Sequence, residues 1–405
     1  MRSFFDLVGF EYKKIFKRKG SIISLVIIAV LTVVCPVLIL IGNVYIDGEP
    51  VETYYQAMIK DREYARVLSG RYIDETLVRE VKEAYSKVSA VGGNELYSIP
   101  EYQEHARPYS GVYYILNTVY TAYGNRARQV INLTEEEMQS FYQIRHGEVL
   151  NWIDTLHISS KSKDKLIQLD SEIEIPFVYS YSDAYWRFFA IMSSTGIFGA
   201  FAVAVCLAPM FAGEYGTGAD QLILSSKFGK NKIITAKLFT GVSFCVVLYL
   251  IMIALTYLVC CGIYGLDGGN APVQLWAPFC IYPFTMWQAA AVYSICILFA
   301  AILVCTLTLL LSSIFKSPFG VIIIISLLIF VPMMFRVPSN TVLMNLYRLL
   351  PSNMMSDWAV LIEYTTYEVF GMTIMPYVFM PLFAVLTTGI ILPFAYRAFK
   401  NHQIG

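Results

Sequence analysis

The stretch FFAIMSSTGIFGAFAVAVCLAPMFA, residues 188–212, contains no charged residue. About 20 apolar residues in a helix are enough to cross the hydrocarbon core of a bilayer. Five further stretches of this kind lie at 21–43, 237–264, 286–314, 318–335 and 375–396. The sequence therefore predicts an all-α polytopic membrane protein with six transmembrane helices.

The overall composition agrees with this prediction. Of the 405 residues, 57% are hydrophobic and only 15% are charged. Soluble domains are roughly half apolar and about a quarter charged. So few charges leave too little polar surface to cover a water-soluble globule of this length. The formal net charge is zero, and nothing in it indicates a nucleic acid as partner.

The basic residues between the apolar stretches predict the orientation of the chain. Lysine and arginine concentrate in the short cytoplasmic flanks of membrane helices. Here every second connection is basic, with Lys13, Lys14, Lys17, Arg18 and Lys19, then Lys227, Lys230, Lys232 and Lys237, then Lys316, and finally Arg397 and Lys400. Both chain ends, including the tail at 397–405, are therefore predicted to lie in the cytoplasm.

The first two spans are separated by a long polar segment, residues 44–187, which this orientation places outside the cell. Helix-spaced apolar residues recur over 52–89, and residues 164–169 could form a shorter helix. Thr134 and Glu137 form a capping-box pattern that predicts a helix running to about Leu156. Ser182 and Asp183 are placed to cap the second span. We expect a mainly helical extracytoplasmic domain.

Small residues recur at every fourth position of the second span. Small side chains at this spacing let membrane helices approach closely. The pattern favours packing within one subunit, and the alternative is a face that lines a subunit interface or a translocation path. The residues concerned are Gly196, Ala200, Ala204, Ala208 and Ala212.

Two cytoplasmic segments could carry function. Residues 1–20 combine apolar side chains at positions 4, 5, 8, 12, 15 and 16 with flanking lysines, which predicts a helix lying in the membrane surface. The alternative is a simple basic anchor. The connection at 213–236 contains Glu214-Tyr215-Gly216-Thr217-Gly218, then a short apolar cluster at Leu222–Leu224, and returns to the membrane through lysines. An ordinary connecting loop is the alternative here.

These features resemble the permease subunit of ABC-2-type ATP-binding-cassette transporters, which has a cytoplasmic elbow helix, six spans and a short coupling helix after the second span. The resemblance also extends to 348–353 in the outer loop 336–374, where the family often has a re-entrant hairpin. In this chain Gly218 follows Gly216-Thr217, so the positions of glycine and threonine differ from the commonest form of the family's loop motif. The resemblance assigns ATPase coupling to Glu214, Tyr215, Gly216, Thr217, Gln221, Leu222, Leu224, Ser225 and Lys230.

The resemblance also implies the partners. Two such subunits would pair with two cytoplasmic ATPase subunits, and those subunits would bind ATP and Mg²⁺. The present chain would have no cofactor, no metal and no catalytic residue; Gly229-Lys230-Asn231 lacks the first glycine and the hydroxyl residue of a phosphate-binding loop. We expect an exporter of an amphipathic peptide, drug or lipid-like cargo, multi-pass in a bacterial plasma membrane.

Two other functions remain open. The chain could be a ligand-sensing or resistance component that signals through an ATPase without bulk transport. It could also be a membrane enzyme or scaffold unrelated to ATP. We expect essentially no buried charge in the spans, which argues against an ion-coupled transporter. Charged residues in place of Leu222 and Leu224 are predicted to uncouple the ATPase while the permease stays folded.

Overall fold

The computed structural model describes residues 4–46, 49–88, 99–122, 130–226, 229–335 and 340–402. Several predictions fall partly outside these ranges. They concern Lys227 among the basic flanking residues, the start of the elbow segment at 1–3, residues 336–339 of the outer loop and residues 403–405 of the tail.

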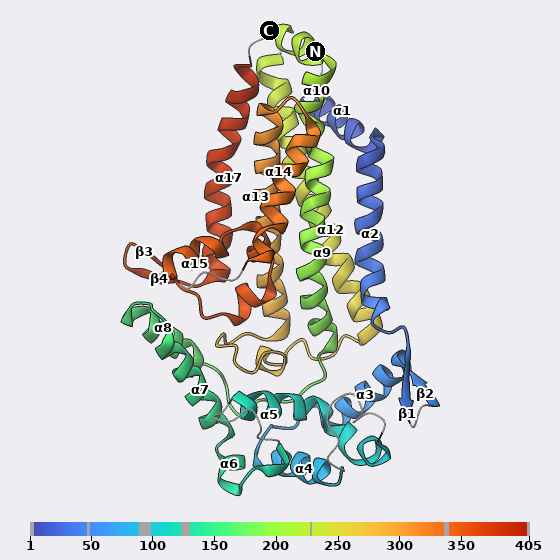
Figure 1. The fold of residues 1–405 in the computed structure, drawn as a ribbon, viewed down its shortest axis with the longest axis vertical. Coiled ribbons are helices and arrows are strands. Elements are labelled where there is room, and N and C mark those ends of the chain that lie inside the picture. Colours follow the sequence, from blue (N-terminus) through green and yellow to red (C-terminus); the bar gives the residue numbers. More distant parts are fainter. Residues whose placement is uncertain are drawn as a thin grey trace.

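Long apolar helices form a bundle (Figure 1). Within the described ranges, five helices are long and apolar enough to cross a membrane. They are α2 (Lys19–Leu38), α9 (Asp183–Leu207), α12 (Ile234–Tyr264), α13 (Met286–Ile314) and α17 (Pro376–Lys400). Each coincides with a predicted span, and the chain is an α-helical, multi-pass membrane protein.

The predicted span at 318–335 corresponds to a shorter helix. α14 (Pro318–Phe330) has 13 residues and is followed by a 3-10 turn, Pro332–Met334. Pro332 lacks an amide hydrogen, so the α-helical hydrogen-bond pattern does not continue through it. At 1.5 Å per residue, α14 itself is about 20 Å long, less than a bilayer core of about 30 Å. A sixth crossing therefore stays a prediction.

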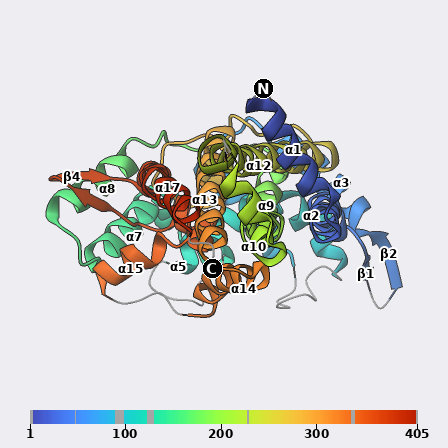
Figure 2. The same cartoon turned by 90° about the horizontal axis from the view of Figure 1, so that it is seen from above.

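α9 is the central helix of the bundle. It packs against α2, α12, α13 and α14, whereas α17 packs mainly along α13. Seen from above, α2 and α17 lie on opposite sides of the central helices (Figure 2). Both carry exposed large apolar side chains, for example Ile27 on α2 and Leu386 on α17. Such surfaces are expected where helices face lipid tails.

The polar segment between α2 and α9 folds mainly into helices, as predicted, at the end of the bundle where α3 and α4 lie (Figure 1). The predicted helix from Thr134 to Leu156 is two helices, because Ser140 leaves the helical conformation (φ −96°, ψ 16°). The capping box itself is confirmed, with Glu137 N donating to Thr134 Oγ1 at 3.3 Å and Thr134 N to Glu137 Oε2 at 2.9 Å. The helices are α3 (Tyr54–Leu68), α4 (Glu75–Ser86), α5 (Ser110–Ala122), α6 (Glu135–Gln139), α7 (Phe141–Thr155) and α8 (Ser160–Ser171).

We call the segment between α2 and α9 the outer domain, although its extracytoplasmic location stays a prediction. Its helices start and break at local sequence signals. The helix-spaced apolar pattern over 52–89 corresponds to two helices, α3 and α4. Gly70 lies between them in the left-handed conformation, at φ 88°, which favours glycine. α9 begins at Asp183 as predicted, although the Ser182 side chain makes no capping hydrogen bond.

Two short antiparallel hairpins were not predicted. β1 (Asn43–Ile46) pairs with β2 (Glu49–Thr53), and β3 (Tyr367–Val369) pairs with β4 (Met372–Ile374). The second hairpin turns through Phe370 and Gly371, both at positive φ, as a two-residue hairpin turn requires. It belongs to the predicted outer loop, which also contains α15 (Thr341–Arg348), α16 (Pro351–Met354) and a π-helical turn, Trp358–Ile362.

The remaining helices lie at the opposite end of the bundle from the outer domain. α1 (Phe4–Lys17) and α10 (Ala212–Thr217) meet there, near the last turn of α17 (Figure 1). The short helix α11 (Ala219–Ser225) and a π-helical turn, Gly229–Ile233, complete the connection to α12. We refer to this region as the basic end, and its cytoplasmic location stays a prediction.

A buried ion network at the candidate coupling site

At the basic end, the central helix α9 stops at a proline. It passes through a 3-10 turn, Ala208–Met210, before α10 begins. Pro209 has no amide hydrogen, which interrupts the helical pattern. The carbonyl oxygens of Pro209 and Met210 accept hydrogen bonds from Arg18 Nη2 at 3.2 Å and Lys237 Nζ at 3.0 Å. Charged side chains from two other segments therefore provide hydrogen-bond donors for the backbone carbonyl groups that follow α9.

A serine on α13 holds the same turn from the other side. The Ser312 hydroxyl donates to Ala208 O at 2.7 Å and accepts from Phe211 N at 3.0 Å and Ala212 N at 3.1 Å. Ser312 is fully buried. Because each buried backbone group needs a partner, this one hydroxyl fixes the direction in which α10 leaves α9.

Next to this turn lies an ion network of four side chains. Lys237, the fourth residue of α12, is 0% exposed. Its Nζ lies 2.6 Å from Glu214 Oε1 on α10 and 3.1 Å from Glu11 Oε2 on α1. Lys14 Nζ lies 2.9 Å from Glu214 Oε1 and 3.1 Å from Glu11 Oε1. Two cations and two carboxylates thus join α1 to α10 and α12, which lie far from it in the sequence.

The electrostatics of the network explain how buried charges are tolerated. Burial of Lys14 disfavours its charged form, but Glu214 and Glu11 outweigh this effect and raise its pKa. The network as a whole is neutral, which limits the desolvation penalty that unpaired buried charges would cause. Phe211 adds an aromatic face, with Lys237 Nζ 5.6 Å from its ring centre.

α1 is positioned so that its one central carboxylate faces inward. Val8, Glu11 and Ile15 are its buried residues, spaced three and four positions apart on one face. Tyr12 Oη lies 2.8 Å from Ser243 Oγ on α12, and Phe5 in the first turn is 72% exposed. α1 is therefore amphipathic, and it packs against α12.

The segment after α10 divides into an exposed and a buried face. Gly218 ends α10 in the left-handed conformation at φ 70°, and α11 starts at Ala219. Leu222 is 76% exposed, whereas Leu224 is 4% exposed and packs inside the chain. The other exposed candidates are Gly216, Thr217, Gln221, Ser225 and Lys230. The structure therefore separates the two leucines that the sequence grouped in one apolar tip.

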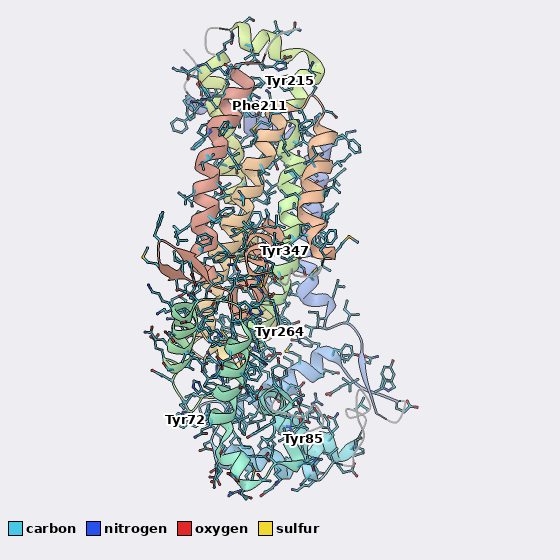
Figure 3. The ribbon with its side chains drawn as sticks, turned by 60° about the vertical axis from the view of Figure 1, so that its left-hand side comes forward. Tyr72, Tyr85, Phe211, Tyr215, Tyr264 and Tyr347 are labelled. Carbon is cyan, nitrogen blue, oxygen red and sulfur yellow. The ribbon has the colours of Figure 1, made fainter. Side chains whose placement is uncertain are left out.

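Aromatic side chains connect this segment to the end of α17. Tyr215 donates its hydroxyl to Ser313 O at 2.7 Å, and its ring centre lies 4.3 Å from that of His402. Phe211 contacts Phe399 with ring centres 4.8 Å apart. Phe211 and Tyr215 lie together at the end of the bundle remote from Tyr85 of the outer domain (Figure 3).

The comparison with known families bears directly on this architecture. A family described as ABC-2 family transporter protein matches residues 19–392. The chain belongs to this ABC-2 family. It is a membrane permease of an ABC transporter, as the resemblance predicted. No match was found among curated proteins. The matched range begins with α2, so the role of α1 in this ABC-2 permease rests on its own contacts with α12.

The predicted small-residue face of the ABC-2 permease lies inside the bundle. All five residues, Gly196, Ala200, Ala204, Ala208 and Ala212, are buried. Gly196 O accepts a hydrogen bond from Tyr249 Oη of α12 at 2.6 Å. At Gly199, which the pattern did not include, a Cβ would lie 2.8 Å from Met252 Cε. In this conformation the small residues allow α9 to pack within one chain; a role in a translocation path stays a prediction.

The sequence reading overlooked the ion network, and its expectation about buried charge needs a correction. Lys237 begins the predicted span 237–264 and is fully buried. The available signal was Glu11, an acidic residue on the apolar face of a basic amphipathic segment. A carboxylate in that position needs a cationic partner. In the part of the chain that the structure describes, no group of three or more His, Cys, Asp or Glu residues could hold a metal ion.

Proposed function

We propose that this permease is an exporter whose separate ATPase subunit contacts the exposed face of α11. Gln221, Leu222 and Ser225 present that face to solvent. An exposed leucine flanked by polar residues is the kind of surface that a soluble partner covers. Hydrolysis of ATP, with its Mg²⁺, would take place in that partner.

The observation that carries this proposal is the ion network behind α11. Glu214 lies in α10, the short helix directly before α11, and forms ion pairs with Lys237 of α12 and Lys14 of α1. Breaking a buried ion pair costs about 3–5 kcal/mol. A displacement of α11 by the ATPase would therefore move α10, α12 and α1 together instead of separating them.

The same network would transmit the displacement to the centre of the bundle. Lys237 and Ser312 hold the turn at the end of α9, and α9 packs on four other helices. Packed helices change between discrete arrangements more readily than they deform continuously. In our proposal, closure of two ATPase subunits would shift a pair of permease subunits, identical or not, between two such arrangements.

We further propose that the cargo is an amphipathic peptide, drug or lipid-like molecule leaving a bacterial cell through its plasma membrane. Large apolar side chains, among them Ile251 and Leu258, are exposed along α12 as well as along α2 and α17. A second permease subunit or the lipid-embedded part of such a cargo would contact these surfaces.

A sensing role without bulk transport is the second candidate. It is supported by a firm contact between the outer domain and the bundle. Arg145 of α7 donates to Pro278 O at 2.6 Å and Cys280 O at 3.0 Å in the α12–α13 connection, and pairs with Asp170 at 2.8 Å. A ligand held by the outer domain could influence the membrane helices through this contact.

Replacing Leu222 by aspartate tests the proposed ATPase contact. We expect the variant to remain folded in the membrane but to lose co-purification with the ATPase and to lose transport. Leu266→Asp is a matched control, because Leu266 is 77% exposed but lies in the α12–α13 connection next to the outer domain. The buried Leu224 is unsuitable for this test, since a charge there would disturb the fold itself.

The outcome separates the candidates. Retention of both ATPase binding and transport by Leu222→Asp would show that α11 is not the contact. An ATPase that binds the wild type and is stimulated by an external ligand, with no cargo movement into or out of vesicles, would favour the sensing role.

A further inference from the structure

A pocket of about 460 Å³ lies where the outer domain meets the bundle. Its walls come from α5, α7, the α12–α13 connection and the segment that follows α16. These parts are neighbours near the labels α5 and α7 (Figure 1). The residues that matter for its chemistry are Trp152, Trp276, Phe279, Asp357, Trp358 and Tyr364.

Half of the residues that line the pocket are aromatic. Trp152 packs against Phe279 with ring centres 4.4 Å apart and against Tyr364 at 6.2 Å. The Tyr364 hydroxyl donates to Phe279 O at 2.7 Å, which holds that ring in place. Trp358 is 58% exposed and Trp152 39% exposed, so ring surface is available to a ligand.

One carboxylate in the pocket, that of Asp357, has no cationic partner among the described residues. Asp357 accepts a hydrogen bond from Trp358 N at 2.9 Å, and the Ser193 side chain lies beside its carboxylate. No lysine, arginine or histidine within the described ranges forms an ion pair with it. Burial raises the pKa of Asp357, as expected for a carboxylate with no cation beside it.

The other charges around the pocket are already compensated. Glu363 also lines the pocket, but its Oε2 lies 2.7 Å from Arg348 Nε. Behind the wall formed by Pro278 and Phe279, Arg145 is paired with Asp170. Among the described residues, therefore, no neighbouring side chain balances the negative charge that Asp357 gives the lining.

We propose that this pocket binds an organic cation with an apolar, aromatic body. The indole and phenyl rings would contact the apolar body and attract the positive charge through their faces. Asp357 would supply the opposite charge, in a site partly shielded from water. The proposal concerns binding alone, so it does not depend on whether α11 contacts an ATPase.

The pocket is also connected to the central helix. Ser193 lies in α9, on the same helix that ends at the turn held by Lys237 and Ser312. A cation that pairs with Asp357 would change how the Asp357 carboxylate interacts with the neighbouring Ser193 side chain. A ligand in the pocket would in this way affect α9, the helix that runs to the basic end.

Tetraphenylphosphonium is a suitable probe, and tetraphenylborate has nearly the same shape with the opposite charge. Three of the chain's five tryptophans line the pocket, so binding to the purified chain in neutral detergent should change tryptophan fluorescence saturably. Asp357→Asn should weaken binding of the cation at least about fivefold, the effect of losing one close charge. Binding of the anion should stay equal or become tighter.

Two further variants keep the test decisive. Asp154→Asn removes a carboxylate that is 82% exposed on α7 but does not line the pocket, and it should leave the affinity for the cation unchanged. Trp358→Leu should weaken the cation while the protein stays folded, because this ring is largely exposed. Absence of saturable binding, equal losses for both probes in Asp357→Asn, or unchanged cation affinity in that variant would overturn the proposal.

Discussion

Replacing Lys237 by methionine probes the ion network directly. Methionine keeps a long, flexible side chain but removes the charge, so Glu11 and Glu214 would share only Lys14. Removing one partner of a buried ion pair costs about 3–5 kcal/mol. The lost hydrogen bond to Met210 O adds about 1 kcal/mol. Because Lys14 still compensates part of the charge, we expect a loss of about 3–4 kcal/mol in the free energy of unfolding.

Unfolding of the purified chain in detergent, followed by tryptophan fluorescence, measures this loss. Lys230→Met is the matched control, since Lys230 is exposed at the same end of the bundle. In the double variant Lys237→Met/Glu214→Gln, one positive and one negative charge disappear together, so stability should partly recover. A Lys237→Met protein as stable as Lys230→Met, or effects of the two single changes that simply add, would refute the network as a coupled unit.

Two further predictions concern other contacts. Ser312→Ala should lower stability by about 1–3 kcal/mol, because the amide groups of the α9–α10 turn lose their buried partner; Ser326→Ala, whose hydroxyl bonds only within its own helix, is the control for unfolding measurements. Hydrogen bonds from Ser159 and Ser162 to the Glu368 carboxylate lower the pKa of Glu368. The contact between β3 and α8 should therefore be fully stable above pH ~4.3, the ordinary pKa of a glutamate. It should weaken as the pH falls through the lowered pKa of Glu368 and the carboxylate becomes protonated. Amide exchange of the hairpin, corrected for intrinsic rates, should show this loss, and Glu368→Gln should remove its pH dependence.

The spans and the capping signals could be predicted from the sequence because they depend on neighbouring residues. Apolar side chains in lipid need no particular partner, so a stretch such as 188–212 predicts its own helix. The capping box at Thr134 also acts over three residues, and it was found where predicted. Local signals did not predict the lengths of all helices: one predicted helix is broken at Ser140, and α14 is shorter than the predicted span.

The candidate coupling site was only partly accessible in this way. The motif at 214–225 lies in the connection between α9 and α12, and its coupling role stays a prediction; periodicity did not separate the exposed Leu222 from the buried Leu224. That distinction depends on what lies beneath α11. The same holds for the aromatic pocket, whose rings come from α7, from the connection after α12 and from the segment after α16.

Local composition alone determines that this chain is a helical membrane protein with basic residues gathered at one end. The family relationship likewise follows from the sequence. Only the tertiary structure brings Glu11, Glu214 and Lys237 together, since more than 200 residues separate the first from the other two. Hydropathy is a property of each segment, whereas an ion pair depends on the distance between two atoms, and that distance exists only after the helices have packed.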